Sequence, residues 1–134
     1  KTMIDKDSMY NTPPCWCIYM LGLVLDWLEE KGGVEGMEAI KHGKARMLYD
    51  TIDASRLFTC AVEKDSRSDM NVVFRTASEE LDAKFVKESV DAGFTNLKGH
   101  RSVGGMRASI YNAMPLEGVQ ALVAFMQKFE SQHI

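Results

Sequence analysis

The sequence is poor in cysteine, with three in 134 residues, no CxxC motif, and no histidine at ligand spacing from a cysteine. On a helix, Cys15 and Cys17 would point about 200° apart and could not share a metal ion. The cysteines therefore predict no metal site and no cofactor chemistry. We expect Cys15, Cys17 and Cys60 to be buried, reduced thiols of a cytosolic protein.

The sequence also lacks a secretory leader, since no basic segment, apolar run and small-residue cleavage site follow one another after Lys1. The chain is therefore expected to be a piece of a longer protein or a processed product. Its one long apolar run, 15–25, has 11 residues, too few for a bilayer span of about 20. The formal net charge is −3 and the pI about 5.6, without the basic face of a nucleic-acid binder. We expect neither a membrane nor a nucleic-acid partner.

The sequence otherwise has ordinary globular composition, 46% hydrophobic and 26% charged, and enough length for one domain. Apolar periodicity, caps and breakers predict helices over 13–31, 34–53 and 78–92 and from Pro115 onward. Thr12 is the expected N-cap of the first helix, and Thr76 with Glu79 has capping-box spacing before the third. Short apolar runs predict strands at 57–62, 70–75, 94–97 and 107–111.

This order predicts an α+β fold, a small and largely antiparallel sheet with helices packed on it. The first helix is apolar on every face, which is typical of a helix buried on all sides. In so short a chain it needs a partner domain or subunit to cover it. We expect two parts: a lead-in with the apolar helix in 1–33, and a small domain of order α-β-β-α-β-β-α in 34–134.

Residues 92–115 contain no aspartate or glutamate, although the chain has 19 acids in all. The same stretch carries Lys98, His100, Arg101 and Arg107, and its glycines allow a backbone to approach a ligand closely. Arginine binds carboxylate and phosphate with paired N–H donors, so the cluster is a candidate anion site. Cations around a glycine turn are, however, more often solvated or paired within the protein. The glycine pattern is neither a Walker loop nor GxGxxG, and the residues alone indicate only a possible small-anion site.

The run KGHRSVGGMRASIYNA, residues 98–113, resembles the C-terminal signature of the phosphoserine aminotransferases. YNTPP (10–14), followed by the apolar helix and Gly32-Gly33, is similar to a second block of that family. Met70-Asn71 ahead of an apolar strand resembles a third, and MPLEG (114–118) continues the first. The blocks fall in order along the whole chain.

The resemblance implies the C-terminal small domain of a fold-type I aminotransferase, cytoplasmic and homodimeric, with pyridoxal 5'-phosphate as cofactor. Such an enzyme moves the amino group of glutamate onto 3-phosphohydroxypyruvate, giving phosphoserine and 2-oxoglutarate in serine biosynthesis. In many bacteria the same enzyme also serves pyridoxine biosynthesis, acting on a phosphorylated hydroxythreonine.

The family pattern also implies roles for five residues. Arg107, in GGxRAS, would grip the substrate α-carboxylate, and His100 with Arg101, in KGHR, would hold the substrate phosphate. Asn11 and Thr12 would touch the cofactor phosphate from the neighbouring subunit. The start of a helix suits a phosphate because of its free amides and dipole. Plain helix capping by Asn11-Thr12 is the ordinary alternative and is compatible with that role.

The lysine that binds the cofactor covalently, the aspartate under its ring nitrogen and the ring-stacking aromatic belong to the family's larger N-terminal domain. No residue here matches them, so we expect no catalytic residue in this chain and no activity from it alone. The alternative function is an autonomous, non-catalytic domain that binds a phosphorylated metabolite or a protein partner. The apolar first helix argues against it, because an autonomous domain would not leave such a surface uncovered.

Overall fold

The computed structural model describes residues 1–134 as two compact units, Lys1–Met37 and Glu38–Ile134. The long helix α3 (Gly33–Ala54) contributes its first turn to the first unit and the rest to the second. None of the helices is both long and apolar enough to cross a lipid bilayer.

The first unit contains α1 (Thr2–Asp5), which the sequence did not predict, and α2 (Cys15–Glu30). The expected cap by Thr12 is wrong: Pro14 is the N-cap, without a side-chain hydrogen bond. The physical reason is the pair Pro13-Pro14, because a residue that precedes proline is disfavoured in the helical region and the helix can begin only after both.

Helix α2 ends where Gly32 and Gly33 take positive φ angles of 90° and 66°. Within this chain α2 buries none of its residues, so its burial by a partner domain or subunit stays a prediction. The prediction of buried cysteines is wrong for this chain: all three are free, but Cys15 and Cys17 are exposed on α2 and Cys60 is half-buried. Apolar side chains on every face of one helix find no second layer within a unit of this size.

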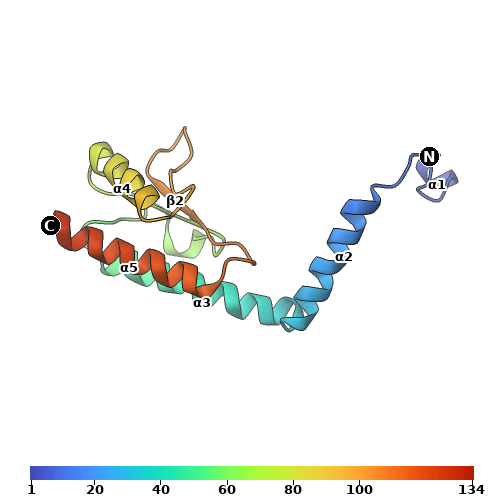
Figure 1. Ribbon diagram of the computed structural model, residues 1–134, viewed down its shortest axis with the longest axis horizontal. Helices are drawn as coiled ribbons and strands as arrows, with labels where there is room; N and C mark the ends of the chain where they lie inside the picture. The colour runs from blue at the N-terminus through green and yellow to red at the C-terminus, as the bar shows by residue number, and fades with distance from the viewer. The chain divides into compact units, whose positions relative to one another are not determined.

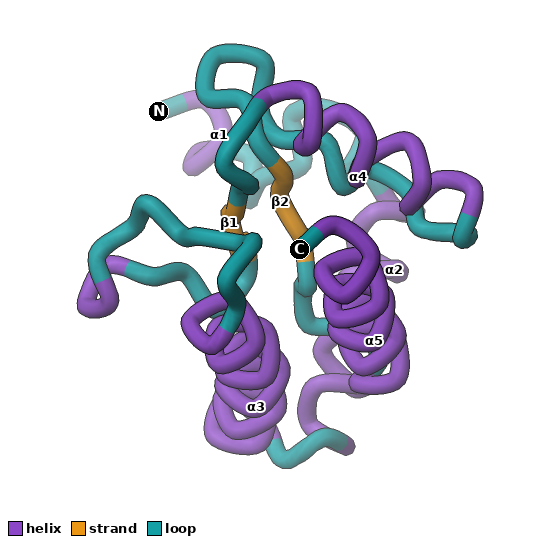
Figure 2. The backbone as a smooth tube through the Cα atoms, turned by 90° about the vertical axis from the view of Figure 1, so that its left-hand side faces the viewer, coloured by secondary structure: helices purple, strands orange, loops and turns teal.

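The second unit is a two-stranded sheet with helices on one face. Strands β1 (Asn71–Phe74) and β2 (Met106–Ser109) pair antiparallel, with Val72 opposite Ala108 and Phe74 opposite Met106. These four side chains are buried in one core with residues of α3, α4 (Glu79–Asp91) and α5 (Leu116–His133). Figures 1 and 2 show α3 and α5 side by side beneath the strands. The predicted α+β class is confirmed.

Phe85 lies at the centre of this core. It is fully buried, and its ring packs against the rings of Phe58, Phe74, Phe125 and Phe129 at centroid distances of 5.1–5.8 Å. Aromatic rings from two helices, one strand and one loop thereby fix the helical layer against the sheet.

Two of the four predicted strands are wrong. Segment 57–62 makes only a single bridge, Thr59 to Arg75, and the chain before β2 makes one, Lys98 to Met106. The segments are apolar because Leu57, Phe58 and Leu97 are buried in the core. A loop segment whose apolar side chains fill a core has the same sequence pattern as a short buried strand, so the sequence does not distinguish a loop from a strand here.

The capping box predicted for the third helix is also wrong. Ser78 is the N-cap of α4, and its hydroxyl accepts from the backbone N–H of Leu81 at 3.2 Å. Thr76 instead donates its hydroxyl and its backbone N–H to one oxygen of Asp82, at 2.8 and 2.7 Å. Ser78, two residues after Thr76, therefore provides the N-cap hydroxyl that was expected from Thr76.

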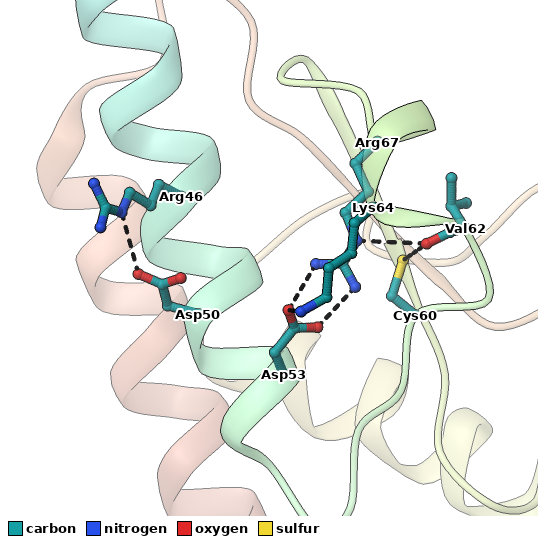
Figure 3. Close-up of polar contacts among 7 residues, drawn as sticks. All are labelled: Arg46, Asp50, Asp53, Cys60, Val62, Lys64 and Arg67. Carbon is teal, nitrogen blue, oxygen red and sulfur yellow. Dashed lines mark hydrogen bonds and ion pairs between the residues drawn. The ribbon is translucent and has the colours of Figure 1, made fainter.

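The loop that enters β1 is fastened to α3 by a polar cluster, of which Figure 3 draws Asp53, Lys64 and Arg67. The guanidinium of Arg67 donates to both carboxylate oxygens of Asp53, at 2.9 and 2.7 Å, and lies over the ring of Tyr49 at 4.6 Å. Lys64 adds a contact of 3.3 Å to Asp53. The Tyr49 hydroxyl donates to the Ser68 carbonyl, and the Ser68 hydroxyl accepts from the amides of Met70 and Asn71. Helix α3 therefore sets the start of β1.

Candidate anion-binding site

The signature segment forms a closed loop, 98–105, immediately before β2. The Gly99 amide donates to the Gly105 carbonyl at 2.8 Å, and the amides of Val103 and Gly104 both donate to the His100 carbonyl at 2.9 Å. Two glycines make this closure possible. A Cβ on Gly99 would lie 2.1 Å from the Gly104 carbonyl oxygen, and one on Gly105 would lie 2.8 Å from that of Phe74. Any other residue at either place would force the backbone apart.

His100 and Arg101 are exposed on this loop. The backbone N–H of Ser102 donates to His100 Nδ1 at 3.3 Å, and the Ser102 hydroxyl lies 2.7 Å from the same atom. A nitrogen that accepts from an amide carries no proton, so in the neutral ring the N–H is on Nε2. That N–H has no partner within the chain and is free to donate to an anion.

A groove of about 840 Å³ lies between this loop and α4. Its lining includes five basic side chains, Arg75, Lys87, Lys98, His100 and Arg101, and also three acids of α4, Glu79, Asp82 and Asp91. Asp82 is occupied by Thr76, and one Arg75 nitrogen donates to the Val103 carbonyl at 2.9 Å. The stretch that is free of acids in the sequence is therefore not free of them in space.

Arg107 lies on β2, opposite Val73, and does not line that groove. It is half-buried; its backbone N–H donates to the Leu97 carbonyl at 2.8 Å, while its buried Nε has no hydrogen-bond partner. No acid pairs with Arg107, nor with His100, Arg101 or Lys98: none of them is among the ion pairs of the chain. The intramolecular pairing that would explain these cations as purely structural is not observed.

Sequence reasoning missed a polar group beside Arg107. The Oδ1 atom of Asn71 accepts from the hydroxyls of Ser109 at 3.1 Å and Tyr111 at 3.4 Å. Asn71 and Ser109 are cross-strand partners, two pairs along from Val73 and Arg107. Strand alternation places residues 71 and 73 on one face of β1 and residues 107 and 109 on the matching face of β2. The position of Asn71 beside Arg107 follows from the register of the two strands, which the sequence did not provide.

Asn11 and Thr12 lie in the first unit, between α1 and α2, and are exposed. Since neither caps α2 by its side chain, the amide and the hydroxyl remain free to bind a ligand. The structure brings His100 and Arg101 together in one loop and places Arg107 on the neighbouring strand. Asn11 and Thr12 belong to the other unit.

The chain belongs to the class-V aminotransferase family, whose family model matches residues 1–122. Its relatives include phosphoserine aminotransferases. It is 58% identical over 129 residues to the phosphoserine aminotransferase of Listeria monocytogenes, covering 96% of this chain and 36% of the relative. It is 56% identical over 134 residues to that of Lactococcus lactis.

Solved structures give the same result. The phosphoserine aminotransferase from Bacillus circulans subsp. alkalophilus superposes with a TM-score of 0.95 at 53% identity, over 99% of this chain and 37% of that one. A phosphoserine aminotransferase from Trichomonas vaginalis, solved with pyridoxal phosphate bound, superposes with a TM-score of 0.86 at 40% identity, over 93% and 36%. The predicted fold-type I family is thus confirmed. The chain spans little more than a third of the length of these relatives.

Proposed function

We propose that this chain is the C-terminal portion of a phosphoserine aminotransferase, a cytoplasmic, homodimeric enzyme. The parent would transfer the amino group of glutamate to 3-phosphohydroxypyruvate, giving phosphoserine and 2-oxoglutarate. The observation that carries the proposal is the pair of unpaired cationic places on this small domain, the His100-Arg101 loop and Arg107 on β2. A substrate with a phosphate at one end and a carboxylate at the other needs two such places.

Arg107 is suited to the α-carboxylate. Its guanidinium is half-buried and free of an acidic partner, so a bound carboxylate would not compete with an internal ion pair. The planar fork offers two parallel N–H donors to the two carboxylate oxygens. Donor and acceptor substrates both carry an α-carboxylate, so one arginine serves both half-reactions.

His100 and Arg101 are suited to the phosphate. The free Nε2–H of His100 and the exposed guanidinium of Arg101 are donors on a loop closed by glycines. A dianionic phosphate can accept hydrogen bonds from both side chains. Because the loop projects away from the core, these residues are placed to reach a ligand held by another part of the enzyme, including a second subunit.

The cofactor would be pyridoxal 5'-phosphate. The side-chain amide of Asn11 and hydroxyl of Thr12 are neutral donors of the kind that bind a phosphate, and their exposure leaves them available. When bound, the cofactor stores the amino group between the two half-reactions. The lysine that carries it would belong to the remaining part of the parent, and we expect residues 1–134 alone to be inactive.

The exposed apolar side chains of helix α2 support the proposal that this helix is covered in the parent enzyme. Trp16 is 71% exposed, and Tyr19 and Leu21 are each 58% exposed. We propose that the rest of the subunit or its dimer partner covers this surface. An additional reaction on a phosphorylated hydroxythreonine, as in pyridoxine biosynthesis, would use the same phosphate and carboxylate contacts.

The test compares the full-length parent with residues 1–134. The parent should bind pyridoxal phosphate, seen by cofactor absorbance. It should form one equivalent of 2-oxoglutarate from glutamate alone, and continue to turn over only when 3-phosphohydroxypyruvate is supplied. The 134-residue chain should do none of these. Turnover by the short chain, or a parent that ignores the phosphorylated substrate, would contradict the proposal.

A further inference from the structure

The face of the sheet opposite the helical core carries a group of four side chains, Asn71, Val73, Arg107 and Ser109, all half-buried. The Ile110 amide donates to the Met70 carbonyl at 3.0 Å. The 71–109 and 73–107 pairs are therefore the narrow, non-hydrogen-bonded pairs, in which Cα atoms approach to about 4.5 Å. Asn71 and Arg107 are diagonal neighbours in this grid, within reach of a long side chain.

The amide of Asn71 is oriented with its oxygen toward two hydroxyls of the partner strand and its extension. Its Oδ1 accepts from two hydroxyls, those of Ser109 at 3.1 Å and Tyr111 at 3.4 Å. Reversal of the amide would place Nδ2 against both hydroxyls and require each of them to accept instead of donate. With the oxygen so occupied, the two N–H groups of Nδ2 make no hydrogen bond within the chain and are available to an acceptor.

Arg107 leaves donors unused on the same face. Its Nε is buried without a hydrogen-bond partner, which is costly unless a ligand supplies an acceptor. A carboxylate has two oxygens with about four acceptor positions. The guanidinium fork can fill only one edge, and the remaining positions need donors from another side chain.

We propose that Asn71 is a second substrate-binding residue, which donates from Nδ2 to the α-carboxylate that Arg107 grips. The inference rests on the proposed function. Ser109 and Tyr111 act through Asn71 as positioning residues, because their hydroxyls keep Oδ1 turned toward them and Nδ2 toward the ligand. A neutral amide completes the site without a second cation, which matches the single negative charge of an α-carboxylate. The ligand class is the one shared by the amino donor and the 2-oxo acceptor.

The experiment uses the full-length parent with its cofactor, and follows each half-reaction by stopped-flow absorbance. Asn71→Ala should raise the dissociation constants for glutamate and for the phosphorylated oxo acid alike, by about 10- to 100-fold, the range for a hydrogen bond to a charged group. Ser109→Ala leaves Nδ2 of Asn71 in place. It should raise the same dissociation constants by less than a third of the factor found for Asn71→Ala. Asn96→Gly, which removes an exposed amide at a left-handed position (φ 61°) that glycine accepts, is the matched control and should react like the wild type.

A purely structural role for Asn71 predicts a different pattern. In that case the Ser109→Ala, Tyr111→Phe double variant removes the same hydrogen bonds and would match Asn71→Ala in both binding and thermal stability. If Asn71→Ala does not fold, Asn71→Thr suits a strand, keeps a hydroxyl for Ser109 and lacks the amide, and it should show the same weakened binding. A wild-type parent without either half-reaction would overturn the proposed function itself. A reactive parent whose Asn71 variants bind normally overturns only this inference.

Discussion

The ammonium of Lys44 donates to the carbonyl oxygen of Tyr111 at 2.8 Å, at the point where β2 leaves the sheet. The same nitrogen donates to the Met114 carbonyl at 2.9 Å and lies 3.5 Å from that of Asn112. Lys44 is fully buried on α3 and is in none of the ion pairs of the chain. Burial lowers its pKa, and the three carbonyls are the groups that keep the ammonium satisfied.

We expect Lys44→Met to lower the free energy of unfolding by about 2–4 kcal/mol. Methionine fills a similar volume and removes the cost of burying a charge, but it leaves three carbonyls of the 111–114 turn without a donor. Chemical denaturation followed by far-UV circular dichroism would measure it, since both tryptophans lie in α2 and do not report on this unit. Lys41→Met, which loses only a 3.8 Å surface contact to Asp69, is the control and should stay near wild type. An unchanged or raised stability for Lys44→Met would show that desolvation outweighs the three bonds.

The Asp53–Arg67 pair predicts acid sensitivity. Hydrogen bonds from Arg67, with Lys64 assisting, lower the pKa of Asp53 from 3.8 to about 2. A carboxyl group whose pKa is lower in the folded state stabilises that state fully above its unfolded pKa. The contribution is lost as pH falls from about 4 toward 2. In a denaturation series over that range, Asp53→Asn should be less stable than wild type at pH 7 and converge with it near pH 2. A constant difference at all pH values would contradict this role.

Gly105 and Gly104 offer a matched pair of substitutions in the signature loop. Both have positive φ, 65° and 76°, so alanine costs about 1–2 kcal/mol at either place. Only Gly105 also faces backbone: a Cβ there would lie 2.8 Å from the Phe74 carbonyl oxygen, whereas one on Gly104 meets nothing within 4 Å. Thermal melting should therefore show a larger loss for Gly105→Ala than for Gly104→Ala. Equal losses would mean that β1 yields easily at Phe74.

In the full-length parent, Arg107→Lys should reduce kcat/KM by roughly 30- to 1000-fold, or about 2–4 kcal/mol, in both half-reactions. Lysine keeps the charge but loses the two-pronged fork. The assay is stopped-flow absorbance of the cofactor with glutamate and with the phosphorylated oxo acid separately. A variant that spares either half-reaction would remove Arg107 from the α-carboxylate.

His100→Ala and Arg101→Ala should affect the phosphorylated half-reaction more than the glutamate half-reaction. Glutamate offers only a side-chain carboxylate where the other substrate offers a dianionic phosphate. The glutamate half-reaction therefore depends less on these two side chains. The same stopped-flow measurements give the ratio of the two effects for each variant. Equal slowing of both half-reactions would reject the phosphate role even within this family.

The helices were the most predictable elements of the fold, because each carries its own periodicity and breakers. The expected 34–53 and 78–92 lie within two residues of α3 (Gly33–Ala54) and α4 (Glu79–Asp91). The strands were less so. Segments 70–75 and 107–111 contain β1 and most of β2, but 57–62 and 94–97 are not strands. Segments of four to six residues are too short to distinguish a strand from a loop whose apolar side chains fill a core.

The candidate site divides in the same way. The sequence by itself determined that Lys98, His100, Arg101 and Arg107 lie close along the chain among glycines, and a long motif gave the family. Only the tertiary structure decided that α4 brings acids to the His100 loop, and that Arg107 lies on a strand outside that groove. It also decided that Asn71, 36 positions before Arg107, becomes its diagonal neighbour. Residue types and local spacing are written in the chain, but cross-strand neighbours depend on register, which is set by the buried partners of both strands at once.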